Sequence, residues 1–121
     1  MSSLARDLVK KAHGEIKVYS SGALSSTTYA DIITPTAGTK ICILSVINRP
    51  TASNSVLYLG LAPSGTDHSD KLFIDGMVWA YSSFYMNYER CPPIGGKNWT
   101  LQYKIATNSV RLMVHYLELP V

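Results

Sequence analysis

The chain has 121 residues and a formal net charge of +3; 46% of its residues are hydrophobic and only 16% are charged. A chain of this length suits a single domain that buries roughly two-thirds of its unfolded surface. Its eleven lysines and arginines are scattered along the chain, so nucleic acid is not an expected partner, and no apolar run is long enough to span a membrane.

Residues 1–14 predict a short amphipathic helix or arm ahead of the main domain. Ser2 and Ser3 are good N-cap residues, and Gly14 stands where a helix commonly ends. The apolar residues at helical spacing are Leu4, Leu8, Val9 and Ala12. A helix this short is unstable alone in water, so its apolar stripe must dock on its own domain or on a partner subunit. The charges at positions 6, 7, 10 and 11 do not fit a signal peptide, which predicts synthesis in a reducing cytoplasm.

Residues 15–121 predict an all-β domain. Short runs rich in β-branched and aromatic residues alternate with clusters of Gly, Pro, Ser, Thr and Asn. The expected strands are Ile16 to Ser20, Thr28 to Ile33, Lys40 to Asn48, Ser55 to Leu61, Lys71 to Trp79, Ser82 to Tyr88, Trp99 to Ile105 and Val110 to Leu119. About eight short strands without a later helix favour an antiparallel β-sandwich of jelly-roll type.

The run from Lys40 to Asn48 is the most apolar of these strands and should lie centrally in a sheet. A strand with one solvated face alternates apolar and polar residues, whereas both faces of this one are apolar. Its odd-numbered face carries Ile41, Ile43 and Ile47, and its even-numbered face carries Cys42, Leu44 and Val46. Both sets cannot face the interior of one two-layer sandwich. One of them therefore needs cover from the N-terminal helix or from a neighbouring subunit.

The strand from Trp99 to Ile105 shows the clearest alternation in the chain. Its odd-numbered residues are apolar, and the polar residues between them, Thr100, Gln102 and Lys104, predict a solvated face. The stretch from Ala106 to Ser109 then predicts a hairpin turn into the last strand.

The last strand, Val110 to Leu119, again has more apolar residues than one buried face requires. Val110, Leu112, Val114 and Tyr116 are expected to face the core, and the opposite face carries Arg111, Met113, His115, Leu117 and Leu119. Such a surplus is typical of a surface buried in an oligomer or under the N-terminal helix. We interpret His115 as an imidazole that hydrogen-bonds at an interface. The candidate oligomer-interface residues are Met113, His115, Leu117, Leu119, Ile41 and Ile43.

A dense group of aromatic residues lies between positions 77 and 88. Core and sheet-edge packing is the simplest interpretation, and a subunit interface is another. As a third interpretation, Trp79, Tyr81, Tyr85 and Tyr88 could form a platform on which sugar rings stack, as in a lectin-like module.

No residue pattern in the chain predicts a catalysed reaction. Cys42 and Cys91 fit neither a disulfide framework nor a zinc site. The stretch Asp67-His68-Ser69-Asp70 has no defensible metal-ligand spacing and is interpreted as a solvated turn. Because no Gly-x-Ser-x-Gly elbow is present to hold a nucleophile, we expect no catalytic residues, no cofactor and no metal.

From Thr36 to Val121 the chain resembles small β-sandwich accessory proteins in the virions of tailed bacteriophages and prophages. The shared features are the Pro-Thr-Ala-Gly-Thr-Lys turn ending at Lys40, the following Ile-x-Ile-Leu-Ser-Val strand, Val56-Leu-Tyr-Leu59, Pro93-Ile-Gly-Gly96, Trp99-Thr-Leu101 and Val114-His-Tyr-Leu-Glu118. The resemblance implies a building block, often trimeric, that decorates a capsid or forms part of a fibre or tail. It also implies contacts with other virion proteins such as the major capsid protein.

Together these observations favour a virion protein, either a capsid decoration or head-fibre subunit, that forms a homo-oligomer, with a trimer favoured. The alternative is the lectin-like module, with surface glycans as possible partners. An enzyme is the third interpretation. Leu44→Asp is expected to unfold the domain, whereas Met113→Asp or Leu117→Asp should leave a folded chain that fails to assemble.

Overall fold

The computed structural model describes residues 6, 8, 10, 16–51, 55–65, 70–79 and 83–121. The predicted helix over residues 1–14 lies outside these residues except for three positions and stays a prediction. The strands are β1 (Lys17–Ser20), β2 (Ala30–Ile33), β3 (Thr39–Pro50), β4 (Ser55–Ala62), β5 (Lys71–Trp79), β6 (Phe84–Asn87), β7 (Thr100–Thr107) and β8 (Val110–Pro120). All eight predicted strands are confirmed, each to within two residues at each end.

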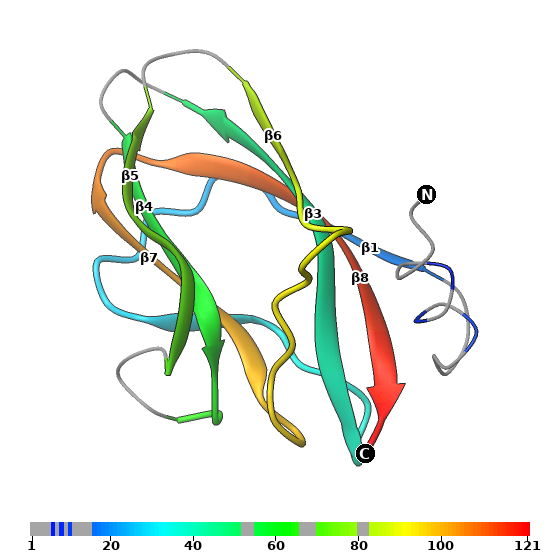
Figure 1. Cartoon of the computed structure of the whole chain (residues 1–121). Coiled ribbons are helices and arrows are strands. Elements are labelled where there is room, and N and C mark those ends of the chain that lie inside the picture. The colour runs from blue at the N-terminus through cyan, green and yellow to red at the C-terminus, as the bar shows by residue number, and fades with distance from the viewer. Residues whose placement is uncertain are drawn as a thin grey trace.

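The strands form two four-stranded sheets, one in the order β1-β8-β3-β6 and the other in the order β2-β7-β4-β5. Figure 1 shows β8, β3 and β1 in one layer and β4, β5 and β7 in the other. The antiparallel pairs include β1 with β8, β2 with β7, β3 with β6, and β4 with β5. This nested pairing is what a long antiparallel hairpin gives when it is rolled up, and it is the jelly-roll arrangement.

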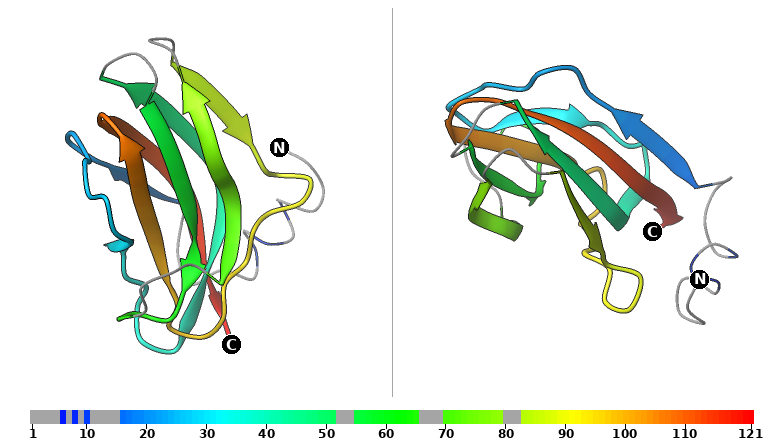
Figure 2. Two further views of the ribbon diagram at one scale, coloured as in Figure 1. Left: turned by 90° about the vertical axis from the view of Figure 1, so that its left-hand side faces the viewer. Right: turned by 90° about the horizontal axis from the view of Figure 1, so that it is seen from above.

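The core lies between the two layers, which Figure 2 shows from two further directions. From the first sheet it includes Ile41, Ile43 and Val46 of β3, together with the predicted Val110, Leu112, Val114 and Tyr116 of β8. From the second sheet it includes Leu57, Leu59, Leu61, Ile74, Leu101, Tyr103 and Ile105. Burying one large aliphatic side chain stabilises the fold by roughly 1.5–3 kcal/mol.

A bulge in β3 corrects the assignment of its two faces. Ile43 pairs with Tyr116 and Ser45 pairs with His115, so Leu44 is an extra residue without a counterpart on β8. The alternation of side chains therefore shifts by one after Leu44. Val46 joins the odd-numbered isoleucines in the core, and the strict odd and even division expected from the sequence is wrong.

Two expectations for the segment around β7 are also corrected. Thr100 and Gln102 are buried rather than solvated, because the Asp31 carboxylate of the neighbouring strand β2 accepts hydrogen bonds from Thr100 Oγ1 (2.8 Å) and Gln102 Nε2 (3.1 Å). The turn that contains Asn108 reverses the chain with a positive φ of 59°, but β7 and β8 belong to different sheets. It is a corner between the layers and not a hairpin.

Candidate interaction surface on the outer face of the first sheet

The outer face of the β1-β8-β3-β6 sheet is the surface turned away from the second sheet. Along β3 and β8 its cross-strand pairs are Cys42 with Leu117, Ser45 with His115, Ile47 with Met113, and Arg49 with Arg111. The character of the pairs changes from apolar to mixed to cationic along the strands. The face therefore has three zones.

The first zone is an apolar cluster that the chain covers with its own residues. Cys42, Leu44, Leu117 and Leu119 are all buried, and Leu8, Ile16 and Ile94 pack against them. This burial raises the pKa of the Cys42 thiol to about 11. Part of the surplus apolar surface of β3 and β8 is thus explained without a second subunit.

Burial corrects the assignment of four of the six candidate interface residues. Leu117 and Leu119 lie under the chain itself, and Ile41 and Ile43 lie in the core between the sheets. Leu117→Asp would place a carboxylate in a buried apolar cluster and is now expected to unfold the domain. Of the three residues predicted to form the docking stripe of the N-terminal helix, Leu8 packs on the cluster. Leu4 and Val9 lie outside the described residues, so their part of the prediction is untested.

The second zone, which we name the central strip, consists of Val18, Ile47, Tyr85, Met113 and His115. Val18 and Tyr85 are large apolar side chains that are 56% and 58% exposed, and the other three are half-buried. The register joins them in two neighbouring rows, since Ile47 pairs with both Met113 and Tyr85 while Val18 pairs with His115. The remaining two candidates, Met113 and His115, thus lie side by side with exposed apolar surface.

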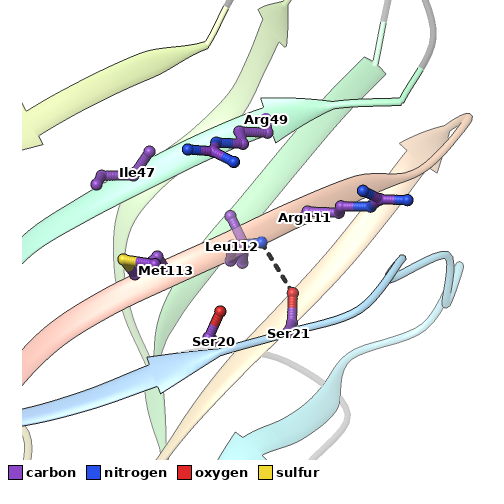
Figure 3. Close-up of a pocket in the computed structure, with 7 residues that line it drawn as sticks. All are labelled: Ser20, Ser21, Ile47, Arg49, Arg111, Leu112 and Met113. Atoms are coloured by element: carbon purple, nitrogen blue, oxygen red, sulfur yellow. Dashed lines mark hydrogen bonds between the residues drawn. The ribbon is translucent and has the colours of Figure 1, made fainter.

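The third zone is a shallow hollow of about 220 Å³ with two arginines on its rim (Figure 3). Its lining residues are Ser20, Ser21, Ile47, Arg49, Arg111, Leu112 and Met113. Arg49 and Arg111 are directly opposed on β3 and β8 and both are exposed. Neither forms an ion pair with any residue in the described ranges. Two like charges at directly opposed positions destabilise an antiparallel pair.

A second hollow, of about 190 Å³, lies on the other side of the Ile47 and Tyr85 row. It is lined by Ile16, Leu44, Ser45, Tyr85, Glu89 and His115. Its charged residue is Glu89, whose carboxylate accepts a hydrogen bond from Asn87 Nδ2 at 3.3 Å. The outer face therefore carries two arginines beyond one side of the central strip and the Glu89 carboxylate beyond the other, where Lys40 and the exposed Arg90 are the nearby cations.

His115 and Ser45 are the groups on this face that come nearest to a catalytic arrangement. Ser45 Oγ and His115 Nδ1 are 3.1 Å apart, as a nucleophile and its base would be. A third group that orients the base is the usual requirement, and within the described ranges no carboxylate hydrogen-bonds this imidazole. No group of three or more His, Cys, Asp or Glu side chains in those ranges is placed to hold a metal ion.

The proposed aromatic platform is not assembled by the residues that can be placed. Tyr85 lies on the outer face, whereas Tyr88 packs against the core and contacts Phe73 edge-on, with ring centroids 5.4 Å apart. Burial raises the pKa of the Tyr88 hydroxyl, consistent with this inward position. The Trp79 side chain and the whole of Tyr81 lie outside the described part of the chain.

Arg49, Arg111, Glu89 and Val18 did not emerge from the sequence as site residues. The four residues come from separate segments of the sequence, and only the pairing of β1, β8, β3 and β6 brings them onto one face. An arginine near one end of each of the two longest apolar strands was the one available signal.

Comparisons with known proteins do not supply a relative from which a role could be transferred. The sequence matches no family model, and no curated protein and no solved structure matches it. In the part of the chain that the structure describes, no helix is long and apolar enough to cross a membrane. The outer face is therefore interpreted from its own residues.

Proposed function

We propose that the protein is a non-enzymatic structural subunit of a phage-like virion, of the capsid decoration or head-fibre type, and that it assembles with copies of itself through the central strip. The observation that supports self-assembly best is the exposure of Val18 and Tyr85 next to the half-buried Ile47 and Met113. Aromatic residues and methionine are enriched in the cores of protein interfaces. A strip of this kind is more favourable buried than in water.

The virion part of the proposal is supported by the resemblance described above and by the jelly-roll strand order. Jelly rolls are the architecture of viral capsid domains and also of lectins. Because one architecture serves several roles, the fold by itself does not select between them. The surplus apolar surface on an outer sheet face favours a subunit that is built into an assembly.

Self-assembly is tested by light scattering of the purified wild type and of Met113→Asp. We expect the wild type to have a multiple of the monomer mass and Met113→Asp to have the monomer mass with an unchanged circular dichroism spectrum, because a carboxylate in the strip opposes its burial. Leu72→Asp is the matched control, since Leu72 is an exposed apolar residue of β5 in the other sheet. This variant should assemble like the wild type.

A wild type that remains monomeric at micromolar concentration would contradict the self-assembly proposal. The virion role has a separate test, which is mass spectrometry of purified particles from the phage or induced prophage that encodes the chain. The peptide sequences should be present in the particles at a copy number comparable to other structural proteins. Their absence from intact particles would remove the virion role.

A further inference from the structure

We propose that a second copy of the chain seats on the central strip in a two-fold arrangement, in which the Arg49–Arg111 hollow of each copy receives the Glu89 carboxylate of the other. This inference rests on the proposed self-assembly and specifies its geometry. It starts from the distribution of charge on the outer face, which the self-assembly proposal does not use.

The two charged groups lie at opposite ends of the outer face. On β3, Arg49 is two residues beyond Ile47 in one direction and Ser45 is two residues beyond it in the other. Ser45 pairs with Asn87 of β6, and Glu89 follows two residues after Asn87. With a rise of about 3.3 Å per residue, the arginines and Glu89 are separated by the whole width of the central strip.

A two-fold axis that runs across the strands, along the central strip, exchanges the two ends. Rotation about that axis places the Arg49 end of one copy over the Glu89 end of the other, and the same contact forms twice. Stacking of two copies in the opposite sense would place arginines over arginines. Complementary charges select one orientation of an interface and disfavour the other, so the charge pattern favours the two-fold.

The hollow has the chemistry that a carboxylate requires. Each guanidinium can offer two N–H groups in a fixed fork, which suits bidentate binding of a carboxylate. The Ser20 side chain lines the hollow from β1. Ser21 Oγ accepts a hydrogen bond from the Leu112 backbone N–H at 2.8 Å (Figure 3). Figure 3 shows the two arginine side chains extended in opposite directions along the strands, so a carboxylate in the hollow would bind the Arg49 or the Arg111 guanidinium and offset part of the positive charge there.

The test is a charge exchange between two variants, Arg49→Glu/Arg111→Glu and Glu89→Arg. Each variant alone should self-associate at least about tenfold more weakly than the wild type, because both contacts become repulsive. In an equimolar mixture, the two introduced glutamates of the first variant meet the introduced arginine of the second. The native Glu89 of the first variant meets the native arginine pair of the second.

The mixture should therefore recover association as a heterodimer in sedimentation equilibrium. Lys97→Glu reverses an exposed charge that belongs neither to the central strip nor to its two hollows; it is the control and should behave like the wild type.

The outcomes separate this inference from the proposed function. If the wild type associates but the mixed variants stay monomeric, or if each variant alone associates like the wild type, the arginine and glutamate contact is overturned while self-assembly stands. If the wild type forms a trimer, as the resemblance implies, the two-fold is overturned and self-assembly stands. If the wild type is a monomer, both proposals fail.

Discussion

Glu118 is a buried carboxylate that holds together one end of the first sheet. It accepts hydrogen bonds from the Thr36 backbone N–H (2.8 Å) and from the hydroxyls of Thr36 (3.2 Å) and Thr39 (3.1 Å). Lys17 Nζ lies 3.3 Å away, but the Lys17 side chain is 43% exposed, so solvent screens that ion pair. Burial raises the pKa of Glu118, but these hydrogen bonds outweigh burial and the pKa lies below its ordinary value of 4.5.

This lowered pKa predicts that the domain loses stability in acid. The contribution of Glu118 to the free energy of unfolding is fully present above its unfolded-state pKa and is lost as the pH falls through the folded-state pKa. Glu118→Gln should lower the free energy of unfolding at neutral pH by roughly 1–3 kcal/mol, because an amide cannot accept all the hydrogen bonds that the carboxylate accepts. The same substitution should weaken the acid dependence. Urea denaturation at neutral and acidic pH measures both effects.

Asp75→Asn is the control for this measurement, since Asp75 is exposed in β5. It should leave the urea midpoint at neutral pH nearly unchanged. A Glu118→Gln protein with the same midpoint as the wild type and the same decline in acid would contradict the assignment of this stability to Glu118.

At the scale of the element, the bulge at Leu44 allows β3 to be apolar on both sides. It leaves Leu44 in the covered cluster on the outer face while Val46 returns to the core. Because Leu44 has no counterpart on β8, deleting it would keep Ile41, Ile43 and Val46 on the inner side. Deleting Ile47 would also remove the bulge, but it would move Val46 to the outer face and Ser45 into the core.

We therefore expect the Leu44 deletion to fold and the Ile47 deletion to fail to fold, because the latter replaces the core side chain of Val46 with the Ser45 hydroxyl. The Leu44 deletion should lose roughly 2–5 kcal/mol, the usual cost of removing a buried leucine side chain. Circular dichroism and thermal unfolding of the two purified proteins make the comparison. Two deletions with equal effects would show that the bulge does not set the register of β3.

The same bulge shows what could and could not be predicted from the sequence. Strand positions follow from local features, namely turn residues and apolar runs, and these were predicted well. A one-residue shift in alternation has no local mark in Ile41-Cys-Ile-Leu-Ser-Val46, so the inner and outer residues of β3 were confused. Met113 and His115 could be placed on an outer face because inward and outward residues alternate regularly from Val110 to Tyr116. Arg49 and Glu89 join that face only through strand pairing.

At the scale of the whole molecule, the jelly-roll order makes the sandwich close late along the chain. Among the described residues, β1, near the start, pairs only with β8, at the end, and β2 pairs only with β7. Both are four-residue strands at sheet edges, whereas β3, β4, β7 and β8 each have neighbours on both sides. Strands that are short, peripheral and partly exposed can open without loss of the core.

This difference predicts two classes of amide hydrogen exchange. In the Met113→Asp variant, which we expect to be monomeric, amides in β3, β4, β7 and β8 should exchange only through global unfolding, because opening any of these strands breaks two ladders and exposes the core. Amides in β1 and β2 should exchange faster, through local opening of a single ladder. Denaturant-dependent exchange followed by NMR distinguishes the two classes, since only globally exchanging amides show the full denaturant dependence. If β1 exchanged as slowly as β3 and with the same denaturant dependence, β1 would unfold together with the core strands. Truncation of the chain before residue 21 should then unfold the domain.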